Sequence, residues 1–336
     1  MNGTLYAFTN NGMIGAESLQ FNAVYQGISS GTLSFDNSGT IASSSGSFAA
    51  SLDGYGLDGL TATNSGTIIG GLAVSASFIE QAAPAKLVIA NSGMITATDG
   101  PTLAIYVNDR SSYPYYAPSG ASVVTLTNSG TITAGSTSGA AVVLSMQDNA
   151  SPTASTYAIT NIGTIAATGD GTIRTYPYWY GTNITYTDPA VGLSVYAGNA
   201  VTGTIVNSGT IEATGTAAVA LLVSGTGLDL TNSGTIRGGT GTVLATDDLL
   251  ANDIGGTMLA GAIQTIGSGN DRIVNTGSIF SVRSSVRSIS VAATMQSRTA
   301  AGSKVMSCWA RATTAFSSTP MQCWSAPLMR AKALTA

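Results

Sequence analysis

One short motif, present nine times, limits what this chain can fold into more than any other feature. Its pattern is Asn-x-Gly-x-Ile, and five of the copies read N-S-G-T-I. Successive copies lie 25 to 46 residues apart, and an apolar residue always stands two positions before the Asn. Repetition at such a period is typical of architectures in which each unit stacks on the next. The nine asparagines are Asn10, Asn37, Asn64, Asn91, Asn128, Asn161, Asn207, Asn232 and Asn275.

Each copy is expected to form a corner between two strands. Alternation before the motif, as in Leu33-x-Phe35, turns one side of an extended strand inward. The Asn-x-Gly step then bends the chain, because Gly adopts positive φ freely and Asn tolerates turn geometry. The Ile of the motif begins the next strand and faces the core. One unit is therefore predicted to be a strand, a tight corner, a second strand and a return.

Stacking supplies the core that a single unit lacks. Equivalent strands placed about 4.8 Å apart put Ile on Ile and Asn on Asn, the latter as a ladder of amide hydrogen bonds. Propeller blades need about 40–50 residues per unit, and helical repeats need a period of about 3.6 residues. We therefore predict an all-β fold for residues 1–280, a parallel β-helix solenoid, for which right-handed winding is the common case.

Composition excludes several functions. The chain has 336 residues, no histidine, 8% charged residues and a net charge of −4. The lack of histidine excludes Ser-His-Asp and Cys-His catalysis and imidazole-bound zinc. No nucleic-acid partner is expected, since phosphates need clusters of Lys and Arg and the chain has no basic run. No apolar run reaches the roughly 18 residues of a membrane-spanning helix, and no signal peptide is visible.

Residues 281–336 break the pattern. They contain one glycine, none of the 16 acidic residues, seven of the 12 basic residues and both cysteines, Cys308 and Cys323. One interpretation is a disordered or irregular tail that serves interactions. The other is a frameshift near residue 280, because a shifted reading frame can continue the repeat and place another N-S-G corner at Arg298. In that case the two cysteines carry no information about redox compartment.

The N-S-G-T-I corner, and the stretch G-S-G-N-D-R-I at 267–273 that leads into N-T-G-S-I, resemble the passenger regions of autotransporters, the type V secreted surface proteins of Gram-negative bacteria. The resemblance implies a right-handed β-helix displayed at the cell surface or secreted, commonly as an adhesin and more rarely as an enzyme. It also implies a parent protein anchored in the outer membrane through a barrel. This chain shows neither that barrel nor a signal peptide, so we expect a fragment whose exposed ends can self-associate.

Two aromatic inserts lengthen the repeat, at 106–118 and 174–186. Counted from their own Asn they begin at similar offsets, so we expect both to leave the solenoid at the same corner, two rungs or about 10 Å apart. Loops on one face of a solenoid commonly bind ligands, and aromatic rings with polar tips suit glycans and proteins. The alternative is that the inserts only cover apolar surface. The candidate binding residues are Tyr113, Tyr115, Tyr116, Tyr176, Tyr178, Trp179 and Tyr180.

Four carboxylates come near the same corner, those of Asp53, Glu80, Asp109 and Asp148. An acidic column of this kind could act as an acid–base pair, hold a cation or keep the edge soluble. Paired carboxylates that cleave glycosidic bonds would make the chain a polysaccharide-acting lyase or hydrolase. Acidic residues are few and no motif marks a cleft, so we predict no catalytic residues and keep the enzyme as the alternative.

Asp271 is the one candidate metal ligand. The stretch that contains it resembles a calcium-binding nonapeptide, with Ile266 in place of the first Gly. Calcium in such repeats is bound between neighbouring turns and needs tandem copies, whereas one copy is present here. The alternative is a plain turn, and no other cofactor is expected.

Together these observations favour a non-catalytic, cell-surface or secreted passenger fragment that displays binding loops on a β-helix. Its partners are expected among host or surface glycans and proteins. The remaining alternatives are the polysaccharide-acting enzyme and a non-functional product of a disrupted gene.

Overall fold

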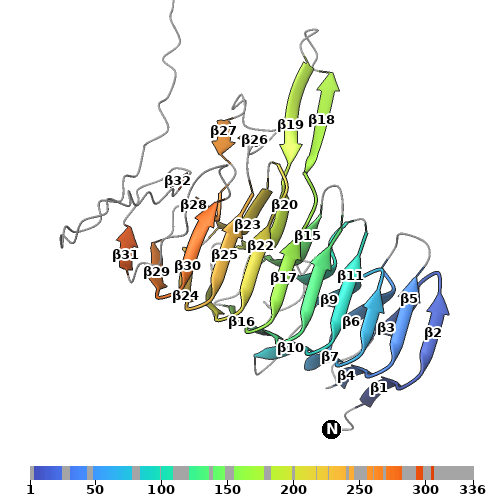
Figure 1. Ribbon diagram of the computed structural model, residues 1–336. Helices are drawn as coiled ribbons and strands as arrows, with labels where there is room; N and C mark the ends of the chain where they lie inside the picture. Colours follow the sequence, from blue (N-terminus) through green and yellow to red (C-terminus); the bar gives the residue numbers. More distant parts are fainter. Residues whose placement is uncertain are drawn as a thin grey trace, which may run out of the picture.

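The chain forms a solenoid of stacked coils in a computed structural model (Figure 1). Each of the first eight coils contributes one strand to each of three sheets, which we name A, B and C, and the described residues contain no helix. The predicted all-β parallel β-helix is thereby confirmed. The structure describes residues 4–24, 31–43, 48–77, 84–98, 100–108, 121–135, 139–147, 155–177, 183–198, 201–216, 218–225, 227–239, 242–245, 256–259, 261–267, 270–281, 293–297 and 304–305.

Sheet A contains the strands that lead into the corner, and each of its parallel strands ends at the Asn of a motif. In order across the sheet they are β1 (Thr4–Asn10), β4 (Gly31–Asn37), β7 (Gly59–Asn64), β10 (Ala85–Asn91), β13 (Ser122–Asn128), β16 (Thr156–Asn161), β21 (Thr202–Asn207), β24 (Asp229–Asn232), β29 (Asp271–Asn275) and the antiparallel β31 (Ala293–Ser297).

Sheet B follows the corner and contains the Ile of each motif. Its strands are β2 (Met13–Ala16), β5 (Thr40–Ser43), β8 (Thr67–Ile69), β11 (Met94–Ala97), β14 (Thr131–Ala134), β17 (Thr164–Ala167), β22 (Thr210–Ala213), β25 (Thr235–Gly238) and β30 (Ser278–Ser281).

Sheet C lies in the part of the repeat that was predicted to be a simple return, and that part of the prediction is wrong. The return is a strand because its residues also alternate, as in the L-A-V-S-A-S of β9, where Leu72, Val74 and Ala76 are buried. The strands of sheet C are β3 (Leu19–Val24), β6 (Ala50–Tyr55), β9 (Leu72–Ser77), β12 (Leu103–Asn108), β15 (Ala140–Gln147), β20 (Ala190–Ala197), β23 (Ala218–Gly225), β28 (Ile263–Gly267) and the antiparallel β32 (Lys304–Val305).

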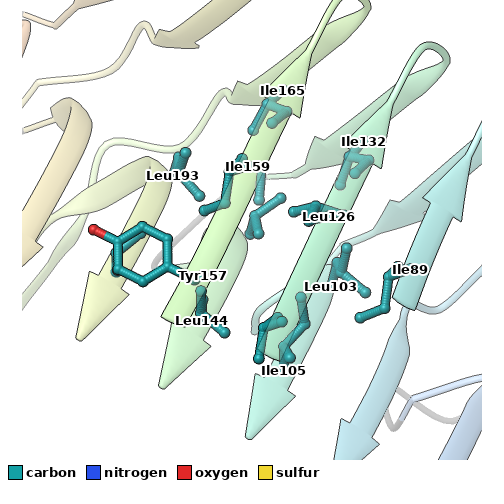
Figure 2. Packing of buried hydrophobic residues seen from close by; sticks show 14 of the residues in the cluster. Ile89, Leu103, Ile105, Leu126, Ile132, Leu144, Tyr157, Ile159, Ile165 and Leu193 are labelled. Carbon is teal, nitrogen blue, oxygen red and sulfur yellow. The ribbon is translucent and has the colours of Figure 1, made fainter. Parts of the chain in front are cut away.

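The motif isoleucines are stacked in single file inside the solenoid, as predicted. Ile68 pairs in register with Ile41 on one side and with Ile95 on the other, and all three are at most 1% exposed. The other two sheets add their own apolar columns, and Figure 2 shows side chains from all three meeting in the middle of the coil. Each fully buried Ile or Leu contributes about 1.5–3 kcal/mol of hydrophobic stabilisation, so the stability of the solenoid comes from many contributions of this size.

The motif asparagines form the predicted amide ladder along the solenoid axis. Nδ2 of Asn91 donates to Oδ1 of Asn128 at 2.8 Å, and Nδ2 of Asn128 donates to Oδ1 of Asn161 at 2.8 Å. The same bond joins every successive pair from Asn10 to Asn275 at 2.7–2.8 Å. Because the amides from Asn10 to Asn232 are buried, the ladder satisfies groups that would be costly to leave without partners.

The corner glycines are needed for a different reason from the one predicted. None of the nine has a positive φ, whereas a Cβ at Gly93 would overlap the carbonyl oxygen of Gly66 in the preceding coil. The same overlap occurs at every corner from Gly39 onward, so close stacking of coils is what demands glycine. Positive φ values are instead found at Gly56, Gly70, Gly71, Gly100, Gly171 and Gly225.

The strand direction reverses at the C-terminal end of the described solenoid. β31 pairs antiparallel with β29, and β32 pairs antiparallel with β28. Most of 281–336, including Cys308 and Cys323, lies outside the described residues, so the tail and frameshift interpretations stay predictions.

Candidate binding face

Most of the residues predicted to bind ligands lie outside the described residues. This holds for the three candidate tyrosines of the first insert and for Glu80, Asp109 and Asp148 among the acids. In the second insert, the backbone of Tyr176 belongs to β18 (Thr172–Pro177), which pairs antiparallel with β19 (Asn183–Asp188). The three aromatic residues that follow, Tyr178, Trp179 and Tyr180, lie outside the described residues, as do Tyr113, Tyr115 and Tyr116 of the first insert.

The two inserts leave the solenoid at different corners, which corrects the expectation of a shared corner. Residues 109–120 connect β12 of sheet C to β13 of sheet A. The β18–β19 hairpin instead lies between β17 of sheet B and β20 of sheet C, and it projects from the solenoid (Figure 1). Counting residues from the Asn placed both inserts at one corner. In the structure the first insert follows the third strand of its coil, whereas the second comes before the third strand of its coil.

Both inserts nevertheless adjoin sheet C, at opposite ends of its strands. Residues 106–108 of the first insert form the end of β12, and its remaining residues follow Asn108. The second insert precedes Ala190, the first residue of β20. Parallel strands have their starts along one edge of a sheet and their ends along the other. The outer surface of sheet C therefore lies between the two points at which the inserts attach.

An exposed column runs across that outer surface, and we name it the tyrosine column. Tyr106 on β12 pairs with Ser145 on β15, and Ser145 pairs with Tyr196 on β20. Tyr106 is 43% exposed and Tyr196 is 52% exposed. The outward direction follows from the strand alternation, since the residues on either side of each tyrosine are buried in the core. In register order the members of the column are Asp53, Ser75, Tyr106, Ser145, Tyr196 and Ser224.

Of the four carboxylates predicted to lie near one corner, Asp53 is the one whose side chain the structure describes. It is exposed on β6 and pairs in register with Asn22 and Ser75. Neither neighbour is a carboxylate, so Asp53 has no second acid beside it within sheet C. Across the described residues, no three His, Cys, Asp or Glu side chains gather to form a metal site.

The tyrosine column has one charged member, Asp53 at one end, and none from Ser75 to Ser224. Beside it runs a second column of outward positions, in which Ala104 is buried and Val143 and Ser194 are half-buried. The ion pair Arg237–Glu212, at 2.6 Å, lies on sheet B, and the pair Arg272–Asp229, at 2.8 Å, lies on sheet A. On β12, β15 and β20 the outer surface therefore offers rings, hydroxyls and methyl groups instead of charge.

Asp271 lies away from the tyrosine column and makes contacts that stabilise the solenoid. It is 8% exposed at the start of β29, where its Oδ1 accepts the backbone N–H of Leu228 at 2.9 Å. Its Oδ2 accepts the hydroxyl of Thr265 at 3.0 Å. A buried carboxylate needs such partners, and here they come from neighbouring parts of the chain. Its role as a calcium ligand stays a prediction.

Tyr196 was missed by the sequence analysis, and Tyr106 was noticed only as the first residue of an insert. A signal was present in the sequence. Residues 103–107 read L-A-I-Y-V and residues 193–197 read L-S-V-Y-A, so each tyrosine occupies an outward position between inward apolar residues. The signal becomes useful only once the return of each coil is known to be a strand.

Comparison with known proteins found no matching family model, no matching curated protein and no matching solved structure. In the part of the chain that the structure describes, no helix has both the length and the apolar character needed to cross a membrane.

Proposed function

We propose that this protein is a non-catalytic binding scaffold, displayed at a cell surface or secreted in the manner of an autotransporter passenger, and that it acts as an adhesin. One observation carries the proposal. The two coils that bear aromatic inserts also bear the exposed tyrosines of sheet C, and the inserts attach at opposite ends of those strands.

Elongated shape and low charge support this function. A stacked solenoid presents a long, regular surface on which each coil adds another contact, as repeat proteins commonly do for extended ligands. Exposed Tyr side chains present an apolar face with a polar tip and are enriched at recognition surfaces. Catalysis is disfavoured because Asp53 faces Asn22 and Ser75 and has no carboxylate neighbour in register.

The test is binding of the full chain to arrays of glycans and of surface proteins. We expect retained ligands, and we expect Trp179→Ala in the second insert to weaken their binding. Val206→Ala is the matched control, because Val206 is 41% exposed on the outer surface of sheet A. A chain that retains nothing, or that loses binding equally in both variants, would contradict the proposal.

A companion assay separates binding from catalysis. The full chain and Asp53→Asn are incubated with neutral and acidic polysaccharides, and new reducing ends or unsaturated products are measured. We expect no products from either protein. Turnover that disappears in Asp53→Asn would identify an enzyme and overturn the non-catalytic assignment.

A further inference from the structure

The tyrosine column has a spacing that is set by the solenoid itself. Tyr106 and Tyr196 are separated by one strand, β15, so their Cα atoms lie two rungs apart, about 10 Å. In-register parallel pairing holds this distance constant, because each rung is hydrogen bonded to the next along its length. The rings are therefore presented at a fixed repeat along the solenoid axis.

The chemistry between the rings is polar and uncharged. Ser145 stands between the two tyrosines in register and is half-buried. Ser75 and Ser224 extend the alternation on either side, so hydroxyl side chains and rings follow one another along the column. A ligand that matches this surface has flat apolar faces at a repeat of two rungs and hydroxyl groups between them.

From this arrangement we propose that the tyrosine column binds an extended, neutral β-1,4-linked glycan that runs along the solenoid axis. This inference rests on the proposed binding function and names its ligand class. In a β-1,4-linked chain each sugar is turned over relative to the last, so every second ring presents the same face. That repeat is comparable to the separation of Tyr106 and Tyr196, and the intervening sugar lies over Ser145.

A neutral glycan fits the column better than a charged one or a protein. The outward residues of β12, β15 and β20 named above carry no charge to pair with uronic acids or amino sugars. Protein hot spots cluster at the centre of an interface. These two tyrosines instead stand singly, two rungs apart, and each is about half exposed, which suits stacking of one sugar ring on each.

The experiment measures affinity of the full chain for cellohexaose and xylohexaose by calorimetry. Cellobiose is the short comparison ligand, maltohexaose the α-linked one and hexagalacturonate the charged one. We expect the two β-1,4-linked hexaoses to bind more tightly than all three comparison ligands. Equal binding of hexagalacturonate or maltohexaose would overturn the assignment of ligand class.

Variants then locate the site. Tyr106→Ala and Tyr196→Ala are each expected to weaken hexaose binding about tenfold, since one stacking contact is lost in each. Tyr106→Phe and Tyr196→Phe keep the stacking face and should bind nearly as wild type. Ser145→Arg places a long side chain between the rings and should block binding, whereas Val206→Ala on sheet A should not change it. Thermal unfolding of every variant shows whether the fold is kept.

The outcomes separate this inference from the proposed function. If Trp179→Ala loses array binding while Tyr106→Ala and Tyr196→Ala bind every ligand as wild type, the scaffold function stands and the tyrosine column is not its site. If the arrays retain only proteins and neither hexaose binds, the scaffold function again stands and the glycan inference fails. Loss of hexaose binding in the two alanine variants, with the Trp179 variant unaffected, supports the tyrosine column and refutes binding by the second insert.

Discussion

Two columns of in-register residues in sheet A differ in how much the amino acid varies from coil to coil. The Asn column is identical in all nine coils, and each member is hydrogen bonded to the next. The column four residues earlier, which is buried from Leu33 to Tyr157, holds Tyr6, Leu33, Leu60, Leu87, Val124, Tyr157 and Gly203 in register.

The difference reflects the directionality of the forces involved. An amide ladder works only if each rung offers a donor and an acceptor at the same height, so a substitution in its middle breaks the ladder bonds to both neighbours. Apolar packing requires only that the total volume be filled. Tyr157 and Gly203 illustrate this, because a Cβ at Gly203 would overlap the ring of Tyr157. The large residue of one coil fills the space that the small residue of the next leaves.

The largest effect is expected where the corner has no room for even one methyl group. Gly93→Ala should destabilise the chain by about 3 kcal/mol or more, because its Cβ would overlap the backbone of Gly66 and no rotamer can relieve this. Gly12→Ala is the control, since no atom lies within 4 Å of a Cβ there. Urea unfolding of both variants checks the prediction. Equal stability of the two would show that stacking tolerates displacement at the corner.

A smaller but still large effect is expected in the middle of the ladder. Asn128→Ala removes the acceptor of Asn91 and the donor to Asn161, and we expect a loss of about 2–4 kcal/mol. Asn10→Ala breaks only the one ladder bond to Asn37 and should cost about half as much. The comparison is made by urea unfolding. A similar cost at both positions would mean that the amides act independently of their place in the column.

The smallest effect is expected in the variable core column. The hydroxyl of Tyr157 is buried and has no hydrogen-bond partner among the described residues, so Tyr157→Phe should stabilise the chain by about 1 kcal/mol. Burial, with a further contribution from the charge of Asp229, raises the pKa of Tyr157 from 10.0 to about 12.

That pKa shift gives the wild type a pH dependence which the Phe variant lacks. Between pH 10.0 and about 12 the unfolded chain releases the tyrosine proton and the folded chain keeps it. The stability contribution of the neutral tyrosine is therefore complete below pH 10.0 and is lost as pH rises to about 12. Urea midpoints of both proteins across this window should diverge with rising pH. Parallel pH profiles would show that Tyr157 does not titrate in the unfolding reaction.

Much of the solenoid could be predicted because its determinants are local and repeated. The positions of Asn, Gly and Ile in each motif indicate the corner, the inward face and the register, and the stacked Ile41, Ile68 and Ile95 confirm them. Sheet C was missed since its strands share alternation but no motif. The reason for the corner glycines was also missed, because the contact with Gly66 that excludes a side chain at Gly93 comes from another coil.

By itself the sequence determined that equivalent residues lie above one another in a β-helix with an apolar core, because nine copies of one motif can bury their apolar faces only by stacking. Only the tertiary structure decided where the inserts leave the solenoid and which exposed side chains lie in one column. Insertions change the number of residues between Tyr106 and Tyr196 but not the number of rungs between their strands, and rungs set the distance.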